Sequence, residues 1–368
     1  MSAQNSVVPL HPTVAIDTHG CKLNQADSDV LLRRFLEAGF HVVGTNDSPD
    51  VYVLNSCTVT HVADAKARSA LRSARRANPN TTLVATGCYS QRRFDEVKAL
   101  PGVDLVLGNF DKHALVDQVL EKFQGLSSKS SPNNSTIGPL SGFQRTRAVV
   151  KIQEGCNQIC SYCIVPKVRG RERSIPLGSL IKQVRAYVDE GFKEVVLTGT
   201  QLGSYGYDIP GTDLADLIES ILRETSLARL RVSSLQPQEI TDELLGLWEN
   251  PRMCPHFHLP LQSGSNTVLR DMRRRYTTET YLSQVKRIYR FLPSASITAD
   301  LIVGFPTEGG REFEESYRFC QDLDLANIHV FPYSIRPGTT AAHVTSKQNS
   351  VEKKNRTKTM LKLASQKA

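Results

Sequence analysis

A group of cysteines near the middle of the chain has the residue types and spacing of a metal centre. Cys156, Cys160 and Cys163 lie in the segment GCNQICSYC, with the spacing C-x3-C-x2-C. Soft thiolate ligands this close on one loop favour an iron–sulfur cluster, zinc or copper. Because C-x3-C-x2-C is not a usual zinc spacing, a cluster is favoured over a zinc knuckle with a distant fourth ligand. Three thiolates on a four-iron cluster would leave one iron open to another ligand.

A second group of cysteines is far apart in the sequence. Cys21, Cys57 and Cys88 end the segments IDTHGC, YVLNSC and LVATGC, and each segment begins with an expected strand. Buried thiols would be the default interpretation. However, the carboxyl ends of parallel strands meet at one edge of a sheet, so these loops are expected to converge there. We therefore predict a second metal centre, and we assign the remaining Cys254 and Cys320 to packing.

The central motif resembles a known family signature. CNQICSYCIVP is similar to the signature of radical S-adenosylmethionine enzymes, in which an aromatic residue precedes the third cysteine, and Tyr162 has that place. The resemblance implies that Cys156, Cys160 and Cys163 hold a 4Fe–4S cluster. Its open iron would bind S-adenosylmethionine, and one electron would cleave this molecule to a 5′-deoxyadenosyl radical.

The N-terminal motifs sharpen this resemblance. THGCKLNQADSD, LNSCTVTHVADAKAR and ATGCYSQ resemble the N-terminal domain of methylthiotransferases, and the similarity runs from about residue 14 to 340. It implies that Cys21, Cys57 and Cys88 hold an auxiliary 4Fe–4S cluster implicated in sulfur delivery. Members of this family usually end in a small RNA-binding β-barrel. The sequence ends at residue 368, so we expect that module to be absent.

Several segments indicate one branch of the family. Residues 57–60, 85–89, 197–206 and 231–237 look like the bacterial branch that modifies threonylcarbamoyl-adenosine. The resemblance implies insertion of methylthio at carbon 2 of adenosine 37 of tRNA. The alternatives are methylthiolation of isopentenyl-adenosine in tRNA or of an aspartate in a ribosomal protein. A non-catalytic iron–sulfur or zinc protein that binds RNA is an alternative of another class, and an inactive family member is a weaker one.

Residues after later strands resemble the family's contacts with S-adenosylmethionine. The candidate cofactor-binding residues are Tyr162, Thr198, Gly199, Thr200, Ser233, Ser234, Gln262 and Val303. A plain turn or a buried strand end is the simpler interpretation for most of them. His256 and His258 share one strand face, but no third zinc ligand is evident, so we expect an inward-packed pair.

Basic residues recur around the expected active face. A single arginine is usually solvated or in a local ion pair, but several together favour a nucleic-acid partner. The candidates for contacts with tRNA are Arg169, Arg171, Arg173, Arg273, Arg274 and Arg275. The family also implies a flavodoxin- or ferredoxin-like electron donor and a sulfur donor as partners.

Alternating strands and helices must position these residues. In the first part, the expected strands are 14–17, 51–54, 83–86 and 105–107, and the expected helices are 27–38, 62–77, 91–100 and 112–123. This pattern predicts an α/β, Rossmann-like domain with a parallel sheet. In the second part, the expected strands are 148–152, 194–197, 230–233, 256–259, 297–303 and 328–333, and the expected helices are 180–189, 214–224, 242–248, 281–291 and 311–323. These predict an incomplete (β/α)6 barrel, with a doubly wound sheet as the alternative.

Composition supports a division into domains. The expected domains are 12–123 with the auxiliary cluster and 142–342 with the radical S-adenosylmethionine core, joined by a linker rich in Ser, Asn and Pro at 124–141. The basic tail 343–368 carries +6 of the formal charge of +8, and we expect a solvated, helical or frayed tail, with a phosphate-contacting arm as the alternative. Since neither a secretory signal nor a membrane-length apolar run is present, the expected location is the cytoplasm, with no membrane partner.

Overall fold

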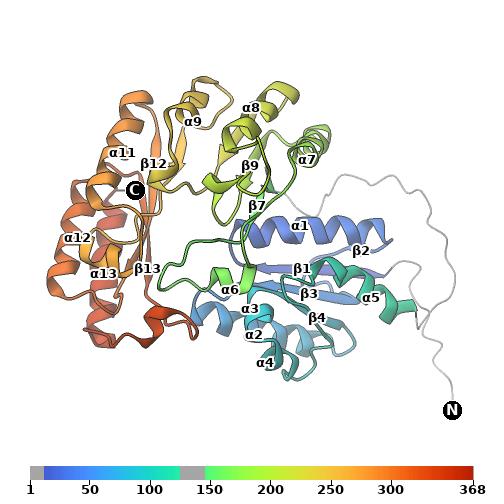
Figure 1. Ribbon diagram of the computed structural model, residues 1–368. Coiled ribbons are helices and arrows are strands. Elements are labelled where there is room, and N and C mark those ends of the chain that lie inside the picture. Colours follow the sequence, from blue (N-terminus) through green and yellow to red (C-terminus); the bar gives the residue numbers. More distant parts are fainter. Residues whose placement is uncertain (1–11, 125–145, 368) are drawn as a thin grey trace, which may run out of the picture. The chain divides into compact units, whose positions relative to one another are not determined.

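The computed structural model describes residues 12–124 and 146–367, which form two compact units divided after residue 145 (Figure 1). The predicted linker 124–141 lies, except for its first residue, outside the described residues. Each unit is described by itself below. In the described ranges, no helix is both long and apolar enough to cross a membrane.

The first unit contains a five-stranded parallel sheet with the order β2-β1-β3-β4-β5. Its strands are β1 (Thr13–His19), β2 (His41–Val42), β3 (Val51–Ser56), β4 (Thr82–Gly87) and β5 (Leu105–Val106). Its helices are α1 (Lys22–Glu37), α2 (His61–Ala77), α3 (Cys88–Arg92), α4 (Phe94–Lys98) and α5 (Leu115–Gln124), with a 3-10 turn, η1 (Lys112–Ala114), before α5. The prediction of a Rossmann-like parallel sheet is confirmed.

The central strands β3 and β4 are buried on both faces. Val51 and Val53 pack in one apolar cluster with residues of α1 and α5, whereas Tyr52 and Leu54 pack in another with residues of α2 and α4. Successive side chains of a strand point to opposite faces, so one apolar run can serve two layers of helices. The two-residue strand β2 was not predicted, and the expected helix 91–100 is interrupted between α3 and α4.

The second unit contains six parallel strands. β6 (Arg147–Lys151), β9 (Glu194–Thr198) and β10 (Arg229–Val232) form one sheet, and β11 (His256–His258), β12 (Ser296–Val303) and β13 (Asn327–Pro332) form another. Isolated bridges, Leu230 to Met253 and Ser234 to His258, connect the two sheets. The prediction of an incomplete six-stranded barrel is confirmed, and the doubly wound sheet is not observed among the described residues.

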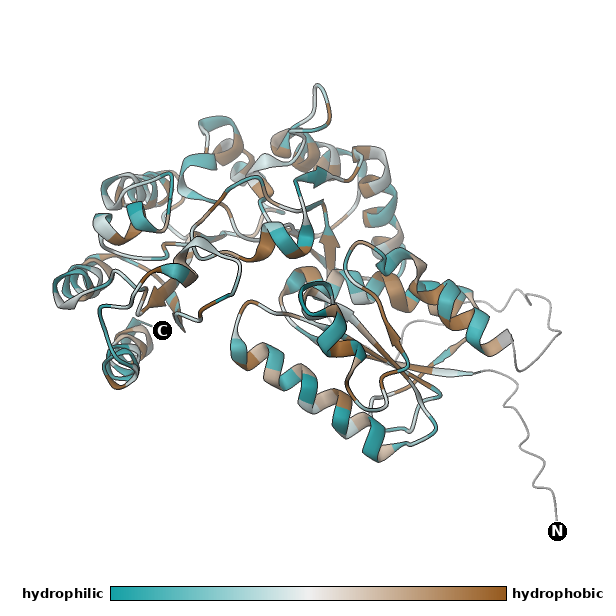
Figure 2. Ribbon diagram, turned by 60° about the horizontal axis from the view of Figure 1, so that its bottom comes forward, coloured by the Kyte–Doolittle hydropathy of each residue, from teal (hydrophilic) through white to brown (hydrophobic). Residues whose placement is uncertain are grey.

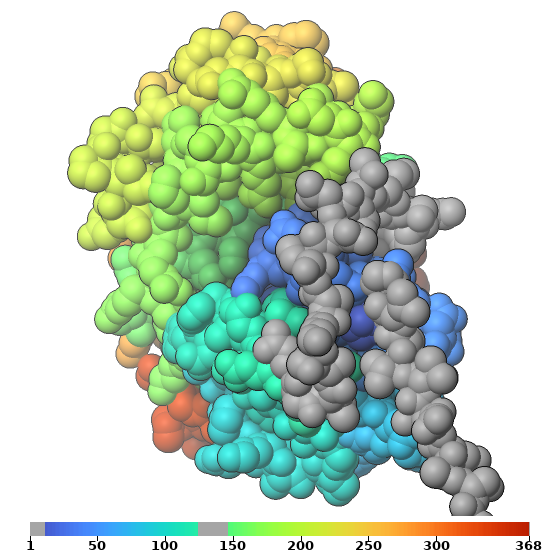
Figure 3. Space-filling model, turned by 90° about the vertical axis from the view of Figure 1, so that its right-hand side faces the viewer, coloured from blue at the N-terminus to red at the C-terminus, as the bar shows by residue number. Residues whose placement is uncertain are grey.

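Helices alternate with these strands and cover one face of them. They are α7 (Leu177–Asp189), α8 (Leu214–Glu224), α9 (Asp242–Gly246), α11 (Thr278–Phe291) and α12 (Gly310–Asp322). Short elements between them are β7 (Gln153–Glu154), α6 (Val165–Arg169), β8 (Arg173–Ser174) and α10 (Asn266–Asp271), together with the 3-10 turns η2 (Leu202–Ser204), η3 (Pro237–Glu239), η4 (Leu247–Glu249) and η5 (Thr340–His343). The side chains of α7 and α8 lie next to each other on the surface (Figure 3).

The strands of the second unit have two different faces. On β12, Ile297, Ala299, Leu301 and Val303 are buried in the main apolar core with residues of the helices, and the residues between them are half-buried. Hydropathy shows the same division, with apolar strands and mixed helices (Figure 2). The half-buried face is the one opposite the helices, and we call it the lumen face.

A long helix in the tail corrects the expected boundary at 343. Helix α13 (Ser350–Lys367) contacts β12, β13 and α12, and it therefore belongs to the second unit. Met360, Leu363 and Ala364 join the apolar core from one side of this helix. The basic residues that surround them in the sequence concealed this apolar stripe, so the expectation of a separate solvated tail is wrong for residues 350–367.

Truncation of Met360 tests whether α13 is part of this core. Met360 is fully buried and Leu361 is 48% exposed, which makes Leu361→Ala a matched control. We expect Met360→Ala to lower the free energy of unfolding by about 2–5 kcal/mol and the control to change it by less than about 0.5 kcal/mol. The single tryptophan, Trp248, is buried in the second unit, so its fluorescence in urea reports this transition. Equal losses in both variants would contradict the docking of α13.

Candidate metal centres

Parallel strands bring Cys21, Cys57 and Cys88 to one edge of the first unit. The register aligns His19 at the end of β1 with Ser56 at the end of β3, and Ser56 with Gly87 at the end of β4. Each cysteine follows one of these positions by one or two residues. The Cys57 amide donates to the His19 carbonyl oxygen at 2.7 Å, which ties two of the loops together.

The Cys57 thiol interacts electrostatically with the other two thiols of the group. Burial, followed by the negative charges of Cys88 and Cys21, raises the pKa of Cys57 to about 12. Cys57 and Cys88 are buried, whereas Cys21 is exposed. Since thiols become metal ligands as thiolates, a positive centre would favour the thiolate form of Cys57. The donor set therefore fits a metal cluster that is reached by solvent from the side of Cys21.

Tight turns place the loops that carry these cysteines. Gly87 has a φ of +97°, and a Cβ atom there would lie 2.5 Å from the Ser56 carbonyl oxygen, so only glycine fits before Cys88. The Asn109 side-chain amide lies 3.3 Å from Cys88 Sγ, and Asn24 Oδ1 lies 3.4 Å from Cys21 Sγ. Sequence analysis missed both asparagines because no spacing relates them to the cysteines.

A buried polar network supports the same edge. Lys112 Nζ donates to Asp27 Oδ2 at 2.9 Å and lies 3.4 Å from Asn55 Oδ1. The Asn24 side-chain amide also donates to Asn55 Oδ1, at 3.1 Å. A buried lysine requires such partners, because an unpaired charge would be strongly destabilising. The network fixes α1 and the end of β3 relative to each other, and therefore the backbone next to Cys21 and Cys57.

In the second unit, Cys156, Cys160 and Cys163 lie on one loop between β7 and α6. Gly155 has a φ of +82°, and a Cβ atom there would lie 1.9 Å from the Arg171 carbonyl oxygen. The Cys156 amide donates to the Gly170 carbonyl oxygen at 3.1 Å. Ser161 joins the loop to two other segments, through Met272 O at 3.1 Å and the Ala341 amide at 2.7 Å. The loop is therefore fixed from several sides.

These three thiols are half-buried. Burial, followed by neighbouring negative charges that include Cys160, raises the pKa of Cys156 to about 11 and that of Cys163 to about 12. The positive charge of Arg274 acts in the opposite direction on both. As in the first unit, the donor set fits a centre that supplies positive charge.

Arg274 was predicted to contact tRNA, and the structure corrects this assignment. Its Nη1 lies 3.2 Å from Cys160 Sγ, and its Nη2 donates to Gln236 Oε1 at 3.0 Å. The guanidinium lies over the ring of Tyr276, 4.9 Å from the ring centroid. Arg274 is therefore held beside the cysteine loop, where a planar cation with several donors can bond a thiolate and an amide at once.

Arg169 is a second correction among the tRNA candidates. Its side chain is only 2% exposed, and its Nη1 lies 2.6 Å from Glu154 Oε1. A buried ion pair of this kind supports the loop and presents no charge to a phosphate. The other four candidates, Arg171, Arg173, Arg273 and Arg275, are exposed.

Sequence analysis missed a polar group that continues from Arg274. Gln236 lies between Arg274 and Gln201, and Gln201 donates to the Glu239 carboxylate. Burial raises the pKa of Glu239 to about 7, although hydrogen bonds from Gln236 and Gln201 favour its ionised form. The segment RVSSLQP carried the only signal, because it includes Gln236.

Most predicted cofactor-binding residues lie at the carboxyl ends of strands. Thr198 ends β9, and the Thr200 amide donates to Gln153 Oε1 at 3.0 Å. A Cβ atom on Gly199 would lie 3.1 Å from the same oxygen. Ser233 and Ser234 follow β10, and Gln262, with a φ of +67°, bridges to Leu301.

Among these residues, the side chain of Val303 faces away from the lumen. Its side chain is 1% exposed and packs in the core with the helices, as the alternation of β12 dictates. Ile302 instead points to the lumen face and packs in a small apolar cluster with Tyr162 and Phe305. The rings of Tyr162 and Phe305 meet edge to face, with centroids 6.4 Å apart. Ile302 is therefore the β12 side chain that lies near the cysteine loop.

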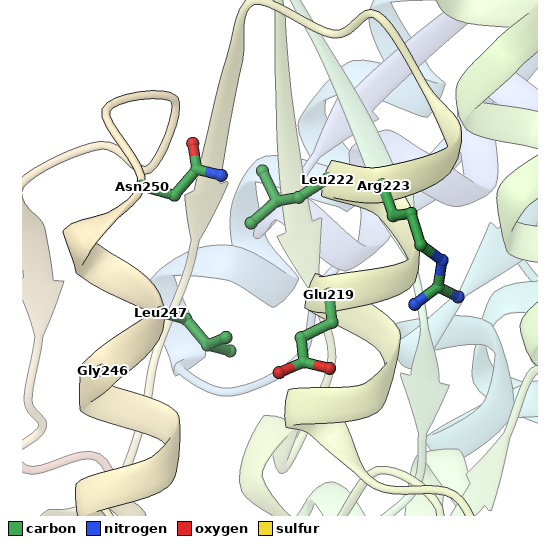
Figure 4. A pocket seen from close by; sticks show the side chains of 6 residues that line it. All are labelled: Glu219, Leu222, Arg223, Gly246, Leu247 and Asn250. Carbon is green, nitrogen blue, oxygen red and sulfur yellow. The ribbon is translucent and has the colours of Figure 1, made fainter.

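A surface pocket of the second unit is lined by residues that are distant in the sequence from both cysteine groups. Glu219, Leu222 and Arg223 of α8 line it on one side, and Gly246, Leu247 and Asn250 line it on the other (Figure 4). None of these is a predicted site residue, and the pocket lies between elements of the helical layer. We therefore locate the chemistry at the strand ends.

Two family models match the chain. Residues 13–108 match the uncharacterized protein family UPF0004, and residues 150–320 match the Radical SAM superfamily. These regions fall in the first and second units, and they include all six cysteines of the two groups.

Similar proteins carry consistent names. The threonylcarbamoyladenosine tRNA methylthiotransferase MtaB of Bacillus subtilis is 39% identical over 96% of this chain and 80% of its own length. The protein of the same name from Aquifex aeolicus is 40% identical, over 95% and 87%. The tRNA-2-methylthio-N(6)-dimethylallyladenosine synthase of Pelotomaculum thermopropionicum is 34% identical, over 94% and 80%.

Solved structures share the fold. The radical S-adenosylmethionine methyltransferase TsrM of Kitasatospora setae has a TM-score of 0.64 and 15% identity, with 90% of this chain and 75% of TsrM covered. Together with the long matches above 30% identity, this establishes both fold and family. The chain belongs to the tRNA methylthiotransferases of the radical S-adenosylmethionine superfamily, transferases that use S-adenosylmethionine and two 4Fe–4S clusters.

Proposed function

We propose that this tRNA methylthiotransferase acts on threonylcarbamoyl-modified adenosine at position 37, beside the anticodon, and inserts methylthio at carbon 2. The identities support this branch: four relatives named for threonylcarbamoyladenosine are 35–40% identical to the chain, and four named for dimethylallyladenosine are 33–35% identical. Isopentenyl-adenosine in tRNA is the closest alternative substrate, because the sequence identities to the two groups of relatives differ only slightly.

We further propose that each cysteine group holds one 4Fe–4S cluster. Cys156, Cys160 and Cys163 would hold the cluster that supplies the electron for cleavage of S-adenosylmethionine. Cys21, Cys57 and Cys88 would hold the auxiliary cluster. The observation that carries the proposal is the convergence of three thiols in each unit, where burial and mutual repulsion disfavour thiolates unless a metal centre compensates them.

Arg274 would act as a positioning residue for the radical cluster. Its guanidinium lies 3.2 Å from Cys160 Sγ and is itself held by Gln236 and Tyr276. Hydrogen bonds and positive charge at a sulfur ligand are among the factors that set a cluster's reduction potential. The fixed positive charge of Arg274 would therefore stabilise the reduced form of the cluster, which carries one more negative charge than the oxidised form.

The residues at the strand ends would hold S-adenosylmethionine on the lumen face. Thr198, Gly199 and Thr200 would lie near its amino group. The hydroxyls of Ser233 and Ser234 would lie near the ribose, and Gln262 follows the next strand. Tyr162 and Ile302 belong to one small apolar cluster, against which an adenine ring would pack.

Exposed arginines around the cysteine loop would contact tRNA. They are Arg171, Arg173, Arg273 and Arg275. Contacts to phosphates are sequence-independent, and an anticodon loop is single-stranded, so its bases can turn into a pocket. A flavodoxin- or ferredoxin-like protein would donate electrons, and a separate sulfur donor would supply the inserted atom.

A glycine substitution tests the position of the radical cluster. Gly155→Ala would place a Cβ atom 1.9 Å from the Arg171 carbonyl oxygen, whereas a Cβ atom on Gly178 would meet nothing within 4 Å. We expect iron in anaerobically purified protein to fall from about eight to about four atoms per chain in Gly155→Ala and to stay unchanged in Gly178→Ala. Full iron content in Gly155→Ala would contradict the assigned loop geometry.

Analysis of tRNA nucleosides tests the substrate. The protein is produced in a bacterial strain that lacks its own tRNA methylthiotransferases, and digested tRNA is examined by mass spectrometry. We expect the 2-methylthio derivative of threonylcarbamoyladenosine to appear with the wild type and with Cys254→Ala, a buried cysteine outside both groups. We expect no product with Cys160→Ala, because the radical cluster would lose a ligand.

Other products would replace this proposal with a named alternative. Methylthio only on isopentenyl-adenosine would move the chain to the other tRNA branch. Unmodified tRNA with a methylthio-aspartate in a ribosomal protein would favour the third branch. A reconstituted protein that forms no 5′-deoxyadenosine from S-adenosylmethionine and dithionite would indicate an inactive or purely RNA-binding protein.

A further inference from the structure

Three neighbouring strands of the second unit place two histidines and an aspartate together. His258 ends β11, Asp300 lies in the middle of β12, and His329 lies in β13. In the parallel registers, His258 pairs with Thr298 and Asp300 pairs with His329. Paired residues on adjacent strands point to the same face, so the three side chains share the lumen face.

The three side chains come close enough to share one ion. One ligand atom from each lies within 4.8 Å of the other two. His258 Nε2 and Asp300 Oδ2 are 3.2 Å apart, and the two imidazole rings have centroids 5.8 Å apart. Ligand atoms of a tetrahedral zinc site are about 3.3 Å apart at normal bond lengths, so only small side-chain rotations are needed.

A hydrogen bond orients one imidazole for this purpose. His258 Nδ1 lies 2.9 Å from the Thr298 hydroxyl oxygen, on the side of the ring away from Asp300. Metal-binding histidines commonly bond an oxygen through their second ring nitrogen, which fixes the tautomer and the ring orientation. With Nδ1 as the donor, Nε2 presents its lone pair toward Asp300 and His329.

The burial of the group suits a site reached from the lumen. The His258 side chain is 12% exposed and that of Asp300 is 29% exposed, while His329 is exposed. The alternate residues of β12 pack against helices, so Asp300 cannot turn to that side. The partners that the sequence did not reveal for His258 are Asp300 on β12 and His329 on β13. His256 is not part of the group.

We propose that His258, Asp300 and His329 bind one divalent transition-metal ion of the zinc type. Two neutral imidazoles and one carboxylate form a donor set found in catalytic zinc and non-haem iron sites. Three protein ligands leave at least one coordination position open, and here it faces the lumen. Water, or an oxygen or nitrogen atom of a molecule in the lumen, would occupy that position.

Zinc binding to the protein with both clusters in place tests this proposal. Anaerobically purified protein is dialysed against zinc with a competing chelator, and zinc and iron are measured together by elemental analysis. We expect one zinc per chain at unchanged iron content. Loss of a residue that only hydrogen-bonds a metal ligand weakens metal binding by about 10–100-fold. Loss of a ligand itself, in His329→Ala or Asp300→Asn, should therefore weaken zinc binding at least about tenfold.

A matched control and a second measurement exclude simpler explanations. His343 is exposed on η5 and outside the group, so His343→Ala should bind zinc as the wild type does. Cobalt in the site should show absorption bands without thiolate charge transfer, and His329→Ala should lose them. The proposal is overturned if the wild type binds no zinc, if both ligand variants bind it normally, or if zinc enters only as iron leaves. None of these readouts depends on which tRNA is modified.

Discussion

The cost of ionising thiols that are shielded from water is the constraint on which both sites depend. Burial is the main cause that raises the pKa of Cys57 and of Cys163 to about 12 and that of Cys156 to about 11, and the charges of neighbouring cysteines add to it. A thiol with such a pKa is neutral at physiological pH and is a poor nucleophile and a poor ligand. The arrangement becomes favourable only when a metal centre supplies positive charge, so protein fold and cofactor assembly are coupled. Cysteines placed only for packing would have no reason to converge.

The two units meet this constraint in different ways. In the first, three separate loops each contribute one cysteine, and their convergence depends on the register of β1, β3 and β4. In the second, all three cysteines lie on one loop, which other segments hold through Ser161 and Gly155. Damage to the sheet would therefore affect the first site, whereas damage to one loop would suffice for the second. The fixed cation Arg274 lies beside the second group.

Much of this architecture follows from patterns of short range. Apolar runs separated by helix-length segments predicted the long strands and most helices, because each strand must bury its side chains. The cysteines were found because β-strand ends and C-x3-C-x2-C spacing are visible in the sequence. Contacts that depend on distant segments were not predictable in this way. Arg274 and Cys160, or His258 and His329, meet only after several βα units have folded, and no local pattern relates them.

Errors of interpretation also had physical causes. The packing of α13 on the core was not predicted because Met360, Leu363 and Ala364 are surrounded by lysines, so average charge outweighed a narrow apolar stripe. Arg169 and Arg274 were assigned to tRNA because sequence gives charge but not burial, and a buried guanidinium is already committed to its partner. Val303 was predicted to contact the cofactor from a strand that could also be buried, and the alternation of β12 places its side chain in the core. Side chains of β12 alternate between two faces. Val303 shares the core face with Leu301, whereas Ile302 shares the lumen face with Asp300. The same alternation places Asp300 beside His258 and His329. One strand therefore supplies both Ile302 to the apolar cluster with Tyr162 and Asp300 to the polar group.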